Sequence, residues 1–143
     1  MVDLLICDDD HFVRTLLKSY LNKSGYRVDE AEDGYAAMEA VSGNRYRLIV
    51  TDVFMPGVNG LALISWLAEN VPATPVVAIS GGSCYQHPKP YLRGAKYLGV
   101  VAAMQKPLDP ARFMEVIQQL LGAPQHAPAE VRGAGDSLLR EVH

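Results

Sequence analysis

The sequence Leu48-Ile49-Val50-Thr51-Asp52 decides the fold of this chain. Three apolar residues and a threonine run directly into a carboxylate, and the loop-forming sequence Val53-Phe54-Met55-Pro56-Gly57 follows. A short apolar run bounded by turn residues is typical of a buried strand in a parallel sheet. The last residue of such a strand lies at the carboxyl edge of the sheet, where open α/β folds bind their ligands. We therefore expect Asp52 at a functional edge.

The same pattern occurs three more times along the chain, and each time the apolar run ends in a polar residue. The runs and their ends are Leu4–Cys7 before Asp8-Asp9-Asp10, Val76–Ile79 before Ser80, and Val100–Gln105 before Lys106-Pro107. A weaker alternating segment, Tyr26–Glu30, predicts a short edge strand. If these strands are parallel, one edge of the sheet collects carboxylates, a hydroxyl and an ammonium group.

Segments with helical spacing separate the predicted strands. We expect helices between Asp10 and Ser24, from about Gly34 to Ser42, from Leu61 to before Pro72, from about Lys89 to Leu98, and from Pro110 to Leu121. In the first of these, Phe12, Leu16 and their apolar neighbours form the core-facing stripe, and Arg14 and Lys18 take the polar face. Five strands that alternate with five helices predict a doubly wound α/β fold with helices on both faces of the sheet.

Length and composition limit the functional classes. The 143 residues fit one domain, which we place at 1–121, and 49% are hydrophobic. Residues 122–143, rich in Ala, Pro and Gly, predict a flexible tail. The net charge of −3 without a basic run argues against a nucleic-acid surface. Cys7 and Cys84 lack metal-ligand spacing, and we expect a cytoplasmic protein without a signal peptide or membrane span.

The acidic residues at the strand ends suggest a metal site. Asp8, Asp9 and Asp52 would lie together if the strands that they follow are neighbours. Three clustered carboxylates repel one another, and a divalent cation relieves that repulsion. Hard oxygen ligands with room for water suit Mg²⁺. The alternative is a solvated turn and helix cap at Asp8-Asp9-Asp10.

Lys106 and Ser80 complete a set suited to phosphoryl transfer. Lysine after an apolar run can pair with an anion, serine can donate a hydrogen bond to it, and Gly81-Gly82 allows close approach of the main chain. Aspartate is a known nucleophile for phosphoryl groups, and the protein then mainly positions groups and neutralises charge. Each residue alone also fits an ordinary role, Ser80 as a strand-end cap and Lys106 as a surface lysine.

These motifs together resemble the receiver domains of two-component response regulators. The acid pair, the D-x-x-M-P-x-x-x-G pattern from Asp52 to Gly60, the strand-end Ser80 and the Lys106-Pro107 pair occur in the family's order. The resemblance covers about 2–121. It implies a flavodoxin-like sheet in the order 2-1-3-4-5 and a cis bond before Pro107.

The resemblance also implies roles for individual residues. Asp52 would accept a phosphoryl group from a histidine kinase or a histidine phosphotransfer protein. Asp9, Asp52 and the Phe54 carbonyl would ligate Mg²⁺, with Asp8 acting through water. Lys106 would hold a phosphoryl oxygen, and Ser80 would be the switch hydroxyl. Phosphoryl transfer and autodephosphorylation would be self-catalysed, so the chain would not be an enzyme with its own substrate.

Two departures from the family pattern concern the output of the signal. Family members usually carry an aromatic residue three positions before the lysine, where this chain has Ala103. The stretch between Ser80 and Lys106 is also long, and the excess falls at about 81–90. We further expect Phe54 to restrict the attack of water on the phosphorylated form.

Two other functions stay open at this point. A haloacid-dehalogenase-like phosphatase would use Asp8 as its nucleophile, since Asp8-Asp9-Asp10 satisfies its D-x-D motif, but it needs further acids after Lys106. A receiver-like binding module would never be phosphorylated. For the receiver we expect output through protein contacts with an unknown target, because the tail is too short for an output domain, and a phosphorylation-dependent dimer is an open alternative.

Overall fold

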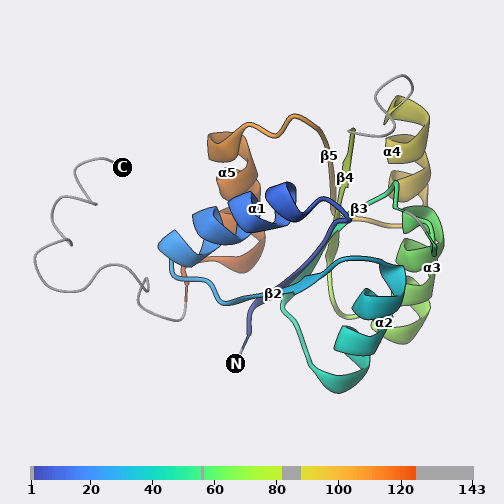
Figure 1. The fold of residues 1–143 in the computed structure, drawn as a ribbon, viewed down its shortest axis with the longest axis horizontal. Coiled ribbons are helices and arrows are strands. Elements are labelled where there is room, and N and C mark those ends of the chain that lie inside the picture. Colours follow the sequence, from blue (N-terminus) through green and yellow to red (C-terminus); the bar gives the residue numbers. More distant parts are fainter. Residues whose placement is uncertain (1, 56, 82–87, 125–143) are drawn as a thin grey trace, which may run out of the picture.

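The computed structural model describes residues 2–55, 57–81 and 88–124, in which strands and helices alternate (Figure 1). The strands are β1 (Leu4–Cys7), β2 (Val28–Ala31), β3 (Leu48–Asp52), β4 (Val76–Ser80) and β5 (Ala102–Gln105). The helices are α1 (His11–Lys23), α2 (Gly34–Gly43), α3 (Gly60–Asn70), α4 (Pro88–Tyr97) and α5 (Pro110–Leu121). The predicted tail beyond Pro124 and most of the predicted long loop, 82–87, lie outside the described residues.

The five strands form one parallel sheet in the order β2-β1-β3-β4-β5. Figure 1 shows α1 and α5 on one face of this sheet and α2, α3 and α4 on the other. This is the predicted doubly wound, flavodoxin-like arrangement. The central strands are fully buried because helices cover both of their faces, which explains their uninterrupted apolar sequences.

Polar caps set the starting points of four helices. Asp10, Asp33, Asn59 and Asp109 precede α1, α2, α3 and α5, and each side chain accepts a hydrogen bond from a main-chain N–H group of the first turn. These bonds satisfy donors that the helix itself leaves unpaired. Pro110 begins α5, as predicted for a residue that has no N–H group to lose there.

The predicted bounds of the two edge strands were wrong by about two residues. β2 covers Val28–Ala31, and Tyr26 before it is buried in the core, where its hydroxyl donates to the carbonyl of Gly122 at 2.7 Å. β5 begins at Ala102, and Val101, which was predicted in the strand, lies before it and is half exposed. An edge strand pairs with a neighbour on one side only, so its apolar pattern alone defines its first and last residues poorly.

The predicted apolar stripe of α1 is wider than the surface that the sheet covers. Leu17 and Leu21 are buried against the sheet, whereas Leu16 is exposed and Phe12 is 71% exposed. The prediction that Phe12 and Leu16 belong to the core was therefore wrong. In the part of the chain that the structure covers, no helix has the length and apolar character needed to cross a bilayer.

Candidate functional site

Strand order brings the predicted site residues to one edge of the sheet. β1 pairs with β3, β3 with β4, and β4 with β5, and the register places Asp52 opposite Ile79 and Ser80 opposite Gln105. Asp8 follows β1 directly, and Lys106 follows β5. The chain thus assembles Asp8, Asp52, Ser80 and Lys106 from four strand ends, as the sequence predicted.

Lys106 forms ion pairs with two buried carboxylates. Its Nζ lies 2.7 Å from Oδ2 of Asp8 and 3.0 Å from Oδ2 of Asp52. Asp8 has no exposed surface, and Asp52 has 3% of its surface exposed. Removing two carboxylates from water is costly, so the ammonium group between them compensates part of that cost. The cis peptide bond before Pro107 agrees with the implication of the resemblance.

Burial sets the direction of the pKa shift for both carboxylates, whereas ion pairing sets it for Lys106. Burial raises the pKa of Asp52 to about 6, although the Lys106 charge and the Phe54 N–H bond oppose the shift. Burial also raises the pKa of Asp8, against its hydrogen bonds from Lys106 and Asp10. Burial alone would lower the pKa of Lys106, but its bonds to both carboxylates raise it. One ammonium group therefore compensates two carboxylates only in part.

The donor set fits a hard divalent cation. Asp8, Asp9 and Asp52 each offer a carboxylate oxygen, and these oxygens lie within 4.8 Å of one another. Asp9 is exposed and makes no hydrogen bond with the described residues, so its carboxylate is available as a ligand. The Phe54 N–H donates to Oδ1 of Asp52 at 2.9 Å, which brings the Phe54 main chain next to the cluster. Oxygen ligands with one open side suit Mg²⁺.

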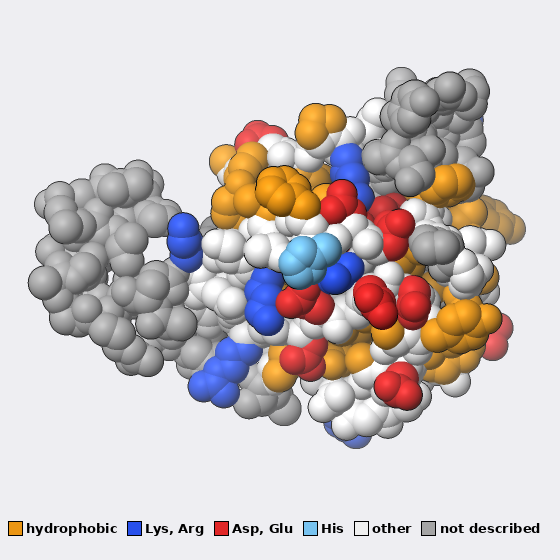
Figure 2. All heavy atoms as spheres, in the orientation of Figure 1, with side chains coloured by type: hydrophobic (Ala, Val, Ile, Leu, Met, Phe, Trp, Pro, Cys, Tyr) orange, Lys and Arg blue, Asp and Glu red, His pale blue; other side chains and the backbone are white. Residues whose placement is uncertain are grey.

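Figure 2 shows a face of the molecule on which acidic side chains gather near basic ones. At the acidic edge, Asp9 and Asp10 after β1 and Glu32 and Asp33 after β2 are exposed or partly exposed. Their charges favour cations at this edge and disfavour free anions. An anion would therefore approach this edge only where a positive charge offsets these carboxylates.

Ser80 has an unusual environment for a buried hydroxyl. Its Oγ is buried and has no hydrogen-bond partner among the described residues. Such a group costs free energy, because it has lost water without gaining a partner. The register places Ala103 opposite Ala78, two positions before the Ser80–Gln105 pair, so methyl groups stand where the family usually has an aromatic ring. Among the described residues, Ser80 is therefore a buried donor without a partner at the edge where the acids lie.

Two glycines allow close approach of segments at this edge. Gly81 has φ +155°, and a Cβ there would collide with the side chain of Lys106. A Cβ on Gly60 would collide with the main chain of Val53, so Gly60 allows α3 to begin directly beneath the loop after β3. The sequence predicted that Gly81 lets the main chain approach an anion, whereas its immediate neighbour in the structure is Lys106.

A match to a family model decides the classification. The model of the response regulator receiver domain matches residues 4–118. This chain belongs to that family. The receiver family has a role in signalling, and aspartate phosphorylation and Mg²⁺ binding through an acidic pocket are properties of the family. The recognition and the fold predicted from the sequence are confirmed.

Several characterised proteins resemble this receiver over about half of its length. The sensor protein EvgS of Escherichia coli K12 is 40% identical over 82 residues, 57% of this chain and 7% of EvgS. Protein PetR of Rhodobacter capsulatus is 40% identical over 77 residues, 54% of this chain and 32% of PetR. The chain thus spans a third or less of these relatives.

Solved receiver structures have the same fold. The receiver domain of NtrX from Brucella abortus has a TM-score of 0.75 and 28% identity, and the match covers 83% of this chain and 98% of that domain. The chemotaxis protein CheY4 of Vibrio cholerae has a TM-score of 0.74 and 24% identity, covering 85% of this chain and 99% of that protein.

Sequence reasoning missed one residue at the receiver's acidic edge. Arg14 was predicted on the solvated face of the first helix, but its side chain is only 11% exposed and its guanidinium donates to the main chain of Asp8 and to Glu30. The sequence feature that could have indicated this contact was the acidic residue Glu30 on the predicted edge strand. The pattern alone could not place Glu30 beside Arg14. The helical spacing of the sequence showed only that Arg14 lies on the side of α1 away from the apolar stripe.

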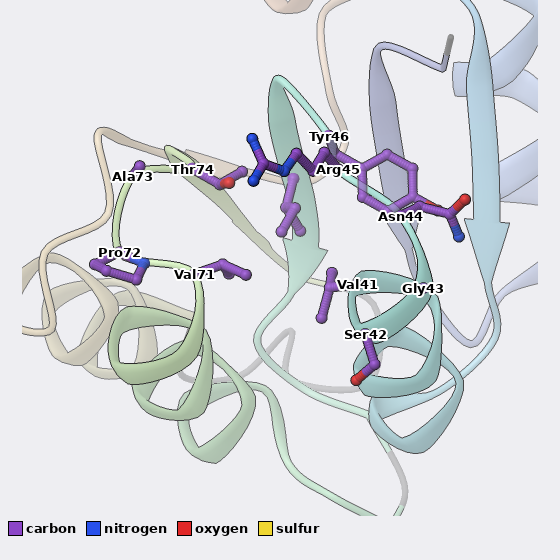
Figure 3. A pocket seen from close by; sticks show the side chains of 11 residues that line it. Val41, Ser42, Gly43, Asn44, Arg45, Tyr46, Val71, Pro72, Ala73 and Thr74 are labelled. Carbon is purple, nitrogen blue, oxygen red and sulfur yellow. The ribbon is translucent and has the colours of Figure 1, made fainter.

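A separate hollow lies at the opposite edge of the sheet. It has a volume of about 680 Å³ and lies between the end of α2 and the loop after α3 (Figure 3). Arg45, Tyr46 and Thr74 contribute polar atoms to its wall. None of the residues predicted for the site is among those that line it.

Proposed function

We propose that Asp52 is the phosphoryl acceptor of this receiver and that a Mg²⁺ ion is required. The observation that carries the proposal is the position of Lys106, whose Nζ bonds Asp52 and Asp8 at the edge where the acids meet. The Asp52 side chain keeps 4% of its surface in solvent whereas the Asp8 side chain keeps none, which favours Asp52 as the nucleophile that a donor can reach. An Asp52 oxygen would attack phosphorus, and the donor's leaving group would depart with the electron pair of the broken bond.

The metal would be held by side chains and one main-chain group. Asp9 and Asp52 would bind Mg²⁺ directly with the Phe54 carbonyl, and Asp8 would contact it through water. When bound, the ion supplies positive charge for the phosphoryl oxygens. The cluster of three carboxylates and the free position of Asp9 support this assignment.

Lys106 and Ser80 would respond to the new phosphoryl group. The Lys106 ammonium would pair with a phosphoryl oxygen in place of one carboxylate, and the unsatisfied Ser80 hydroxyl would donate to another. These bonds would shift an existing equilibrium of the surface formed by α4, β5 and α5. With Ala103 in place of the aromatic residue, the shift would proceed without a ring rotation.

The phosphodonor would dock on the exposed part of α1. A groove of about 490 Å³ lies between α1 and the loop after β5, and Phe12, Leu16, Lys106, Pro107 and Leu108 are among the residues that line it. Its apolar wall beside the acceptor suits the helical surface of a histidine kinase or phosphotransfer protein. A cytoplasmic location follows from this partner and fits the free, buried Cys7 thiol. Output to a target protein or dimer would use another face.

The donor surface can be tested separately from the chemistry. We expect Phe12→Ser to slow phosphorylation by a histidine phosphodonor about tenfold or more, since buried aromatic contacts dominate such interfaces. Labelling by acetyl phosphate, which needs no protein interface, should be unchanged. Tyr97→Ser, at a highly exposed aromatic residue on α4, is the matched control. An equal loss of labelling with the histidine phosphodonor and with acetyl phosphate would mean that Phe12 affects phosphoryl transfer itself, and would contradict a docking role.

The acceptor is tested by intact mass after incubation with acetyl phosphate, with and without Mg²⁺. Wild type should gain one phosphoryl group only with Mg²⁺, and Asp52→Asn should gain none. Labelling that survives Asp52→Asn but is lost in Asp8→Asn would favour the phosphatase alternative. Absence of labelling in wild type, together with absence of Mg²⁺ binding, would favour the unphosphorylated binding module.

A further inference from the structure

We propose that Arg14 is a positioning residue for the metal site, because it fixes the main chain from which the Asp8 and Asp9 carboxylates project. This inference rests on the proposed Mg²⁺ site and adds a residue to it. Arg14 would touch neither the ion nor the phosphoryl group. Its effect would come from holding the loop between β1 and α1 in the geometry that lets Asp9 meet Asp52.

The contacts of Arg14 connect three segments. Its Nη1 donates to the carbonyl oxygen of Asp8 at 2.7 Å, and its Nε donates to Oε1 of Glu30 on β2 at 3.2 Å. Its Nη2 also lies 3.3 Å from Nδ1 of His11. The side chain is 11% exposed, so it is packed in place rather than solvated. The end of β1 is thereby tied to α1 and to the neighbouring strand.

Asp9 depends on this anchor more than its neighbours do. The Asp8 carboxylate is already held by Lys106 and by the Asp10 N–H, and Asp52 is held by Lys106 and the Phe54 N–H. Asp9 has no hydrogen-bond partner among the described residues, so its carboxylate goes where the main chain directs it. The Asp8 carbonyl is part of the peptide group that precedes Asp9, which is the group that Arg14 holds.

Only a guanidinium group can make these contacts together. It donates from several nitrogen atoms in a fixed plane, whereas a lysine ammonium is a single point on a flexible stem. Lys18 also reaches Glu30, at 3.3 Å from Oε2, but donates no hydrogen bond to the described residues of the β1–α1 loop. Lys18 is therefore a matched control with the same charge, the same helix and the same carboxylate partner.

Positioning and simple electrostatics predict opposite results. Removing a positive charge near three carboxylates should strengthen Mg²⁺ binding if charge alone matters. Removing the anchor of the loop should weaken it, because groups that orient metal ligands commonly change affinity about tenfold or more. The sign of the change in Mg²⁺ affinity thus separates the two explanations.

The experiment is a Mg²⁺ titration of the full chain, followed by the backbone amide signals of Asp9 and Phe54 in NMR spectra. Arg14→Met should raise the dissociation constant about fivefold or more. Arg14→Lys, which keeps the charge, should also raise it. Lys18→Met should leave it unchanged or lower it slightly. Urea unfolding of each variant shows that the folded state is being titrated.

Further readouts separate the possible failures. At saturating Mg²⁺ the rate of labelling by acetyl phosphate should return to near the wild-type value in Arg14→Met, since only occupancy was lost. An unchanged or lower dissociation constant in Arg14→Met and Arg14→Lys would overturn the inference while leaving the proposed function intact. Wild type that binds no Mg²⁺, or binds it equally well as Asp9→Asn, would overturn the metal site and the inference together.

Discussion

At the scale of single residues, one ammonium group compensates two buried carboxylates. Lys106 bonds Asp8 and Asp52, and burial still raises the pKa of both acids. The folded chain therefore carries unfavourable charge at the edge that would bind the metal. Cation binding would relieve this repulsion, which links metal affinity and stability to the ionisation of the same carboxylates.

The first prediction concerns the pH dependence of stability without divalent cations. The pKa of Asp52 rises from 3.8 to about 6 on folding, so its contribution to stability is fully present below pH 3.8 and is lost as the pH rises through 6. Asp52→Asn stays neutral. Its stability relative to wild type should therefore increase between about pH 4 and pH 7.5, by roughly 2 kcal/mol in urea unfolding.

The control for this measurement is Asp33→Asn. Asp33 accepts a bond from the Ala36 N–H at the start of α2, and asparagine can cap a helix equally well. Its free energy of unfolding should therefore stay near that of wild type. A difference between Asp52→Asn and wild type that is the same at both pH values would contradict the account of Asp52.

The second prediction concerns the unsatisfied hydroxyl of Ser80. Ser80→Ala removes a buried group that has no described partner, so the free energy of unfolding should stay the same or rise by up to about 1 kcal/mol. Thr51→Val is the control, because the Thr51 hydroxyl donates to the Asp52 carbonyl at 3.0 Å and its loss should cost about 1 kcal/mol. A clear loss of stability in Ser80→Ala would mean that its Oγ is satisfied in solution.

At the scale of secondary-structure elements, close packing of main chain shapes the acidic edge. α3 begins at Gly60, where its first turn lies against the residue that follows Asp52. The loop with Phe54, and with it the proposed carbonyl ligand, is confined between the end of β3 and the start of α3. The glycine would therefore help to define the proposed metal site without contributing a ligand.

The third prediction tests this packing. Gly60→Ala places a Cβ against the Val53 main chain, which cannot move aside as a flexible side chain could, so it should lower the free energy of unfolding by about 2 kcal/mol or more. Gly43→Ala, at the end of α2 with no atom within 4 Å of the added Cβ, should raise it by about 0.5 to 1 kcal/mol. Equal effects in thermal or urea unfolding would contradict the steric explanation.

The positions of the helices and central strands could be predicted from the sequence, whereas the contacts between these elements could be predicted only in part. The ends of β3 and β4 follow from buried apolar runs, and the helix starts follow from caps such as Asp10 and Asp109. The exposure of Phe12 and the burial of Arg14 did not follow. These two properties depend on how far the sheet extends beneath α1 and on which strand lies beside α1. The helical spacing of apolar residues carries no information on either.

At the scale of the whole molecule, strand order converts four separated sequence motifs into one site. Asp8 and Lys106 are 98 positions apart in the sequence yet share a hydrogen bond. Motif order allowed Asp8, Asp52, Ser80 and Lys106 to be predicted as one cluster, because parallel strands direct their carboxyl ends the same way. The sequence could not predict the distances within the cluster or the two ion pairs of Lys106. It also could not predict that Ser80 Oγ lacks a hydrogen-bond partner among the described residues, because all of these depend on how the chain packs.

The fourth prediction concerns the domain boundary. Arg47 Nη2 donates to the Leu121 carbonyl at 2.6 Å, and the Tyr26 hydroxyl donates to the Gly122 carbonyl at 2.7 Å. A chain that ends after Pro124 keeps both bonds and should unfold with the full-length free energy. A chain that ends after Gln119 loses both and should be less stable by roughly 2 kcal/mol. Loss of stability in the longer fragment would place part of the domain beyond Pro124.

The central claim is that Asp52 accepts the phosphoryl group, and locating that group tests it most directly. Protein labelled by acetyl phosphate with Mg²⁺ would be treated with borohydride, which reduces an aspartyl phosphate to homoserine, and then analysed by peptide mass mapping. We predict homoserine at position 52, with Asp8 and Asp9 unchanged, and no conversion without Mg²⁺. Homoserine at position 8, or labelling that leaves Asp52 intact, would contradict the account.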